Sequence, residues 1–226
     1  MTTISTSPHS FASDDVAARL AVIRQRIVDS GGDPAVVRVI AVTKGFGPAA
    51  VEAARAAGLS EIGENYGPEL LGKAPGPPGT NWHFLGAIQR NKVRSLAPVV
   101  ALWQGVARLV EGERIAQCQP GAHVLVQVDL TGLPGRNGCT APEVPGLVEA
   151  LSTLDLHVRG LMTVAPPDPV AGAAAFAAVA RLADELGLPE RSMGMSDDLE
   201  AAVAAGSTMI RIGRALFGPR SPREQG

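Results

Sequence analysis

The chain has 226 residues, of which 46% are hydrophobic, 19% charged and 4% aromatic. Twenty Lys and Arg residues against 22 Asp and Glu residues give a formal net charge of −2, and this near balance argues against binding to nucleic acid or to an anionic membrane. The two cysteines, Cys118 and Cys139, lack the spacing of a zinc site and are too few for a disulfide-stabilised scaffold. A reduced, cytoplasmic setting is therefore expected.

The N-terminal region divides into a polar segment and a helix. Residues 1–12 lack the basic and apolar regions of a signal peptide, and we expect them to be disordered. A helix is predicted from Ser13, which is suited to be its N-cap, to the pair Gly31 and Gly32. Its apolar residues recur at helical spacing: Val16, Leu20, Ile23 and Ile27. No apolar stretch of the chain reaches the roughly 20 residues that a membrane-spanning helix needs.

Beyond this helix, runs rich in β-branched residues alternate with amphipathic segments. The predicted strands are residues 37–43, 59–64, 82–86, 99–103, 123–129, 158–164, 192–195 and 209–212. The predicted helices are residues 48–57, 67–73, 89–96, 107–117, 142–151, 170–186 and 197–205. Strict alternation indicates a parallel sheet with crossover helices, and eight such units favour a closed (β/α)8 TIM barrel. We predict a single α/β domain over residues 13–218, with the N-terminal helix as an addition and residues 219–226 as a flexible tail.

Ligands of such barrels bind where the strands end, so the residues at strand ends are the first candidates. Lys44 closes the first strand and shares a face with Ile40 and Val42. If Val42 points into the barrel, Lys44 points into its mouth. Partial desolvation there lowers a lysine pKa and frees the amine for Schiff-base chemistry. A solvated lysine at a strand end is the alternative.

Two further strand ends carry groups that suit an anion. Ser196 follows the seventh strand and is predicted to cap the helix over 197–205, where unpaired N–H groups gather. Gly213 follows the eighth strand and lets a ligand approach the backbone closely. The alternative for Ser196 is capping alone, and Asp197 and Asp198 must point away if a phosphate binds.

Arg211 is predicted on the interior face of the eighth strand, because it alternates with Met209 and Gly213. A structural ion pair is the alternative. In a closed barrel the eighth strand pairs with the first, so the seventh lies two strand spacings from Lys44, on the order of 10 Å. An amine, anion donors and an arginine would then face one small phosphorylated aldehyde.

Two polar loops follow the second and third strands. Asn65 and Gln89 are candidates to hydrogen-bond a ring substituent, and Asn91 and Lys92 are candidates for the rim. His83 lies between two aromatic residues, and we interpret it as a core histidine bonded to a neighbour.

These residues occur in motifs that resemble the pyridoxal phosphate homeostasis proteins, which are related to the barrel domain of alanine racemase. The motifs are AVTK, GENY, WHFLGAIQRNK, RGLMTV, MGMSDDLEAAVAAGSTMIRIG and ALFG, in this order over residues 37–218. The resemblance implies pyridoxal 5′-phosphate as the cofactor. By motif it places Lys44 as the lysine that holds the cofactor through a Schiff base, and Asn65 near the cofactor.

The resemblance also implies roles for the last strand and its loop. Ser196, Gly213 and the backbone of Arg214 would bind the phosphate, and Arg211 would face the pyridine nitrogen. An arginine cannot accept the pyridinium proton, so the ring would be a poor electron sink. The sequence departs from the family pattern after Lys44, where it reads Gly-Phe-Gly-Pro, and at Arg136, where a lysine is usual.

The sequence leaves three functions to be compared. The first is a cofactor carrier without robust turnover, which sequesters pyridoxal phosphate and delivers it to apoenzymes, as a monomer. The second is an amino-acid racemase, which we disfavour because the chain stops at residue 226 without a second domain and has a single tyrosine, Tyr66. The third is a Schiff-base aldolase that uses no cofactor and binds a sugar phosphate.

Overall fold

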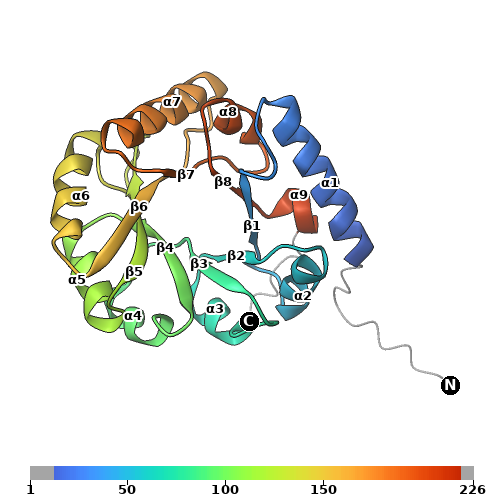
Figure 1. The fold of residues 1–226 in the computed structure, drawn as a ribbon, viewed down its shortest axis with the longest axis horizontal. Coiled ribbons are helices and arrows are strands. Elements are labelled where there is room, and N and C mark those ends of the chain that lie inside the picture. Colours follow the sequence, from blue (N-terminus) through green and yellow to red (C-terminus); the bar gives the residue numbers. More distant parts are fainter. Residues whose placement is uncertain (1–12, 220–226) are drawn as a thin grey trace.

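Eight parallel strands close into a barrel in the computed structural model, which describes residues 13–219 (Figure 1). The strands are β1 (Arg38–Val42), β2 (Glu61–Glu64), β3 (Asn81–Phe84), β4 (Val100–Val106), β5 (Ala122–Val128), β6 (Leu156–Thr163), β7 (Glu190–Ser192) and β8 (Met209–Ile212). They pair in chain order, and β8 pairs with β1. The predicted TIM barrel is therefore confirmed.

An outer ring of helices covers the strands in Figure 1. The helices are α1 (Ser13–Asp29), α2 (Pro48–Ala56), α3 (Gly67–Lys73), α4 (Arg90–Leu96), α5 (Leu109–Cys118), η1 (Ala141–Glu143), α6 (Val144–Ser152), α7 (Pro169–Glu185), α8 (Leu199–Ala204) and α9 (Arg214–Phe217). Residues 1–12, predicted to be disordered, and residues 220–226 of the predicted tail over 219–226 lie outside the described residues. In the part that is described, no helix is both long and apolar enough to cross a bilayer.

The seventh strand is the prediction that was most clearly wrong. The observed β7 is Glu190–Ser192, whereas the sequence predicted 192–195. Gly194 has φ +89°, a left-handed conformation that breaks a strand. The charged residues of β7 are instead stabilised by ion pairs, because Glu190 contacts Arg38 at 2.8 Å.

Small residues allow the helices to pack closely around this short chain. A Cβ placed on Gly112 of α5 would lie 2.1 Å from a methyl carbon of Leu151 on α6. On α7, the buried side includes Gly172, Ala175 and Ala183. The many alanines and glycines therefore serve helix packing.

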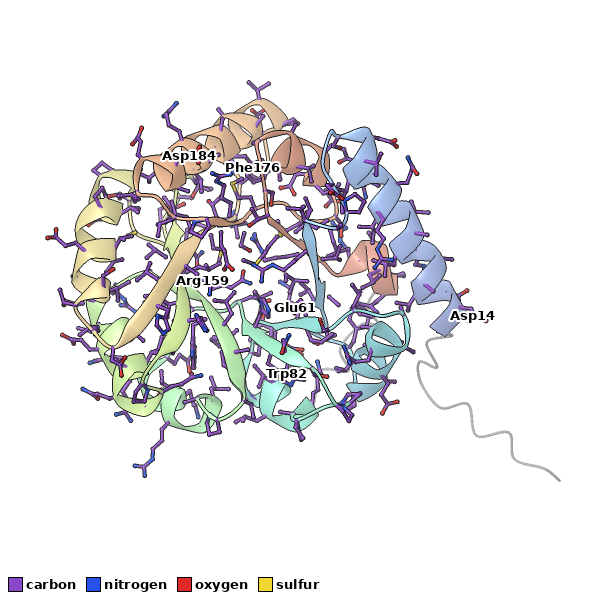
Figure 2. The ribbon with its side chains drawn as sticks, in the orientation of Figure 1. Asp14, Glu61, Trp82, Arg159, Phe176 and Asp184 are labelled. Atoms are coloured by element: carbon purple, nitrogen blue, oxygen red, sulfur yellow. The ribbon has the colours of Figure 1, made fainter. Side chains whose placement is uncertain are left out.

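The hydrophobic core has two parts. The larger one fills the space between the strands and the helices, and includes Trp82, Trp103 and Phe176. The smaller one fills the barrel itself, with Ile40, Leu102, Leu125, Met162 and Met209. Figure 2 shows Asp14 and Asp184 on the outer helices α1 and α7, whereas Glu61 and Arg159 lie toward the barrel axis.

Helix α1 is an addition to the barrel that closes the seam between its last and first units. It packs against α2, α8 and α9 with the predicted stripe, of which Val16, Leu20 and Ile27 are fully buried or nearly so. The seam carries β8 and β1, so α1 supports the strands from which Lys44 and Arg211 arise.

Candidate functional site

A cavity of about 450 Å³ lies at the carboxyl ends of the strands. It is lined by Val42, Lys44, Asn65, Leu85, Arg136, Met162, Val164, Met195, Ser196, Asp197, Arg211, Gly213 and Arg214. All six residues predicted from the sequence to hold the cofactor are in this set. They come from the ends of β1, β2, β7 and β8, so the barrel closure brings them together.

Lys44 lies on the predicted face of β1. Ile40 is in the core inside the barrel. Val42, two residues later, lines the cavity, and so does the half-buried Lys44, which follows the end of β1. The alternation that predicted this direction is therefore confirmed. A half-buried primary amine in a cavity lined by both apolar and polar side chains is suited to condense with a carbonyl group.

A buried polar cluster holds the backbone on both sides of Lys44, and no pattern in the sequence indicated it. The ammonium group of Lys73 on α3 forms a short ion pair with Glu64 and donates to the carbonyl of Thr43 at 2.8 Å. Glu64 accepts from the Thr43 hydroxyl at 2.9 Å, and Glu69 accepts from the Gly45 N–H at 2.7 Å. Glu64 also accepts from the N–H of Asn65 at 3.1 Å. The cluster therefore fixes two segments that line the cavity.

Ser196 is not the cap of the helix that follows it, as the sequence predicted. Helix α8 begins at Leu199 and its N-cap is Asp198, whose carboxylate accepts from the N–H of Met195 at 2.5 Å. The Ser196 hydroxyl instead accepts from the N–H of Ala215 in α9 at 3.3 Å. Ser196 is thus joined to the helix that starts just after Gly213, and the two anion-binding candidates form one corner of the cavity.

Helix α1 supports this corner from outside. Arg26 donates to the carbonyl of Ser196 at 3.0 Å and pairs with Glu200 at 2.6 Å. Arg19 donates to the carbonyl of Leu216 in α9 at 3.3 Å. The added N-terminal helix therefore positions both segments of the corner, a role that the sequence pattern did not reveal.

Arg211 is buried and held by neutral acceptors, so the alternative of a structural ion pair does not apply. Its guanidinium donates to the carbonyl of Ser192 at 2.6 Å, to the Ser192 hydroxyl at 2.9 Å and to the carbonyl of Thr163 at 2.7 Å. Burial lowers the pKa of Arg211 to about 10, with Asp198 acting in the opposite direction. Arg211 is therefore still a cation at neutral pH and offers only N–H donors.

Sequence comparisons assign this barrel to a family. The model of the family described as "Alanine racemase, N-terminal domain" matches residues 12–221. A pyridoxal phosphate homeostasis protein of Pseudomonas aeruginosa is 43% identical over an alignment 226 positions long, which covers 93% of this chain and 96% of the relative. One of Deinococcus radiodurans is 40% identical, over 89% of this chain and 99% of the relative. The chain belongs to the pyridoxal phosphate homeostasis protein family.

A solved structure similar to this chain shows the same barrel. PipY of Synechococcus elongatus, in a structure with pyridoxal phosphate bound, has a TM-score of 0.78 and 33% sequence identity, and the match covers 90% of this chain and all of PipY. The fold implied by the motifs is therefore confirmed for the family.

The polar loops of this homeostasis-family chain only partly follow the sequence-based hypotheses. Gln89 and Lys92 line a separate cavity of about 90 Å³, which shares Asn65 with the larger one. The structure therefore places Gln89 outside the lining of the Lys44 cavity. His83 is a buried core histidine, as predicted, and contacts Glu61 and Gln104. Arg136, where the resemblance implied a lysine, lines the Lys44 cavity.

Proposed function

We propose that this protein binds pyridoxal 5′-phosphate in the Lys44 cavity and serves as a carrier of the cofactor, without robust catalytic turnover. The observation that carries the proposal is the convergence of Lys44, Arg211 and the Ser196–Gly213 corner on one cavity. The homeostasis proteins of Pseudomonas aeruginosa and Deinococcus radiodurans and the pyridoxal phosphate bound to PipY support the choice of ligand.

The residues of the cavity fit the chemical parts of this cofactor. Lys44 supplies a primary amine for an aldehyde, and the apolar side chains of Val42, Leu85 and Met162 suit the faces of an aromatic ring. The N–H groups at the start of α9 lack acceptors within their own helix, as at any helix start, and favour a phosphate. When bound, pyridoxal phosphate supplies an electrophilic carbonyl and a ring that can withdraw electrons.

Arg211 limits what such a ring can do. Three of its N–H groups are engaged by Ser192 and Thr163, and a guanidinium has five. The remaining two can donate toward a ring nitrogen. With a pKa of about 10, Arg211 stays protonated at neutral pH and does not transfer its proton to the ring. An unprotonated ring withdraws electrons weakly. This favours holding the cofactor over carbanion chemistry.

The racemase alternative needs a second base opposite Lys44. Tyr66 is the single tyrosine of the sequence. It is 50% exposed and lines the small neighbouring cavity, and it is not among the described residues of the Lys44 cavity. We therefore expect any turnover of amino acids by this protein to be a slow side activity.

The proposal extends to how the cofactor is used. We place the protein in the cytoplasm as a monomer that delivers pyridoxal phosphate to apoenzymes. Mixing the loaded protein with an apoenzyme of known cofactor demand, and following its recovered activity, tests delivery. Light scattering after size exclusion tests the monomer.

The decisive experiment compares wild type with Lys44→Ala and with Lys92→Ala, a control at an exposed lysine of α4. Wild type and the control should gain a visible absorption band with pyridoxal phosphate, and borohydride reduction followed by peptide mapping should find the added mass on Lys44. Lys44→Ala should show neither. A wild-type protein that stays colourless contradicts the proposal and favours the aldolase reading. Rapid solvent-deuterium exchange into L-alanine favours the racemase.

A further inference from the structure

A continuous hydrogen-bonded chain of five side chains runs through the interior of the barrel. The guanidinium of Arg211 donates to the Ser192 hydroxyl at 2.9 Å. Ser192 contacts Gln104 Oε1 at 2.6 Å, and Gln104 Nε2 contacts His83 Nδ1 at 2.7 Å. His83 Nε2 lies 2.5 Å from Glu61 Oε2. The members come from β8, β7, β4, β3 and β2, so only the closed barrel can assemble them.

The chemistry of the two ends fixes the direction of every bond in the chain. Arg211 can only donate, so the Ser192 oxygen accepts from it and the Ser192 proton goes to Gln104 Oε1. Gln104 then has only its NH₂ group left to face His83, so Nδ1 of His83 carries no proton. Its proton is on Nε2 and is donated to Glu61, a carboxylate that can only accept. One tautomer of His83 and one orientation of Gln104 satisfy the chain.

This chain joins the two opposite ends of the barrel. Of its five described members, Arg211 alone lines the Lys44 cavity. His83 and Glu61 line a second cavity of about 260 Å³ at the amino ends of the strands, together with Arg38, Arg159 and Glu190. Figure 2 shows Glu61 and Arg159 directed toward the barrel axis. Between the two cavities, Gln104 and Ser192 are fully buried.

We propose that Gln104 and His83 are positioning residues for Arg211, which they reach through Ser192, and that Glu61 sets the polarity of the whole chain. The Ser192 hydroxyl can present its oxygen to Arg211 only while its proton has an acceptor, and Gln104 is that acceptor. A second proton on His83 would occupy Nδ1 and oppose the Gln104 NH₂ group. The proton position on His83, at the amino end of the barrel, therefore affects how firmly Ser192 holds Arg211, the residue proposed to face the cofactor ring.

The tautomer of His83 in the wild-type protein gives the first test, and it needs neither cofactor nor substitution. Nitrogen-15 NMR at about pH 8, above the ordinary histidine pKa, should show a proton-free Nδ1 and a protonated Nε2. A protonated Nδ1 in that spectrum overturns the proposal.

Variants of Gln104 give the second test, with His123→Gln as a matched control, because His123 lines the same far cavity outside the chain. Gln104→Met removes the acceptor for Ser192, and we expect hydrogen exchange of the Arg211 guanidinium to quicken about fivefold. Gln104→Glu keeps an acceptor for Ser192, so it should restore slow exchange at Arg211 while it adds a proton to Nδ1 of His83. Equal exchange in Gln104→Met and in the control contradicts the proposal.

The third test uses bound pyridoxal phosphate and rests on the proposed function. Gln104→Met should shift the absorption maximum of the bound cofactor and raise its Kd about fivefold, whereas Gln104→Glu and His123→Gln should keep the wild-type maximum. A role in stability alone would leave the maximum unchanged. If wild type fails to bind the cofactor, the proposed function fails, and the tautomer and the Arg211 exchange still decide the inference.

Discussion

Arg214 at the start of α9 forms an ion pair with Asp197, which lies in the loop after β7. Both side chains line the Lys44 cavity, and both are largely exposed, at 62% and 77%. The ion pair engages the Arg214 guanidinium and places a carboxylate in the cavity that we propose binds the cofactor phosphate. The sequence analysis required Asp197 to point away from a bound phosphate, whereas in the structure Asp197 lines the cavity and pairs with Arg214.

Asp197→Asn should tighten the binding of pyridoxal phosphate. The substitution removes a like charge and releases Arg214, so we expect the Kd to fall about threefold at low ionic strength, with a smaller effect as salt is raised. Stability should change by less than about 0.5 kcal/mol, because the pair is exposed. Asp184→Asn is the matched control, since Asp184 pairs with Arg191 on the outer side of the barrel. Titration of the visible band measures both, and a weaker Kd in Asp197→Asn contradicts the prediction.

Lys73→Met should destabilise the protein strongly. The Lys73 side chain is 5% exposed and that of Glu64 is fully buried, so the substitution leaves a buried carboxylate without its cation, at a cost of about 3 kcal/mol. The double variant Lys73→Met, Glu64→Gln should recover much of this loss because no buried charge remains. Urea unfolding measures the difference, with the exposed Lys92→Met as control. A double variant no more stable than the single one would show that the ion pair is not the cause.

Glu61 gives a pH dependence of stability. Burial alone raises its pKa, but hydrogen bonds from His83, Asn81 and Ser60 outweigh this and lower the pKa from 4.5 to about 2. A lowered folded-state pKa stabilises the fold above the unfolded value, and this contribution disappears as pH falls through the folded value. Wild type should therefore exceed Glu61→Gln by about 2 kcal/mol above pH 5, after a discount for partial exposure, and the gap should close between about pH 4.5 and 2. Urea unfolding over this range tests it, and a gap independent of pH counts against it.

Gly86→Ala should distort the cavity. A Cβ at Gly86 would lie 2.0 Å from the backbone oxygen of Asn65, so the Asn65 loop must move, at a cost of about 2 kcal/mol and with weaker binding of pyridoxal phosphate. Gly72→Ala on α3 is the control, because a Cβ there meets no described atom within 4 Å. It should stabilise the helix by up to about 1 kcal/mol. Thermal unfolding and cofactor titration separate the two variants, and an unchanged Kd in Gly86→Ala would contradict the expected displacement of Asn65.

Local sequence patterns correctly predicted the direction of a side chain where that direction depends only on the residue's own strand or helix. The alternation in β1 predicted the direction of Lys44, and the spacing of Leu20 and Ile23 predicted the buried face of α1. They failed at β7, whose residues Glu190 and Arg191 form ion pairs with other elements. They also failed at Ser196, since a serine before a helix is read as the cap of that helix, and nothing local indicates a partner 19 residues away.

The sequence by itself determined the order of the elements, the motifs of the family and the residues at the strand ends, because these follow from hydrophobic periodicity and from residue types at fixed spacing. Only the tertiary structure decided which polar side chains meet. The cluster of Lys73 with Glu64, the support of Ser196 by Arg26 and the chain from Arg211 to Glu61 all join segments far apart in the sequence. Strand register and barrel closure set these contacts, and buried polar groups must find partners wherever that register places them.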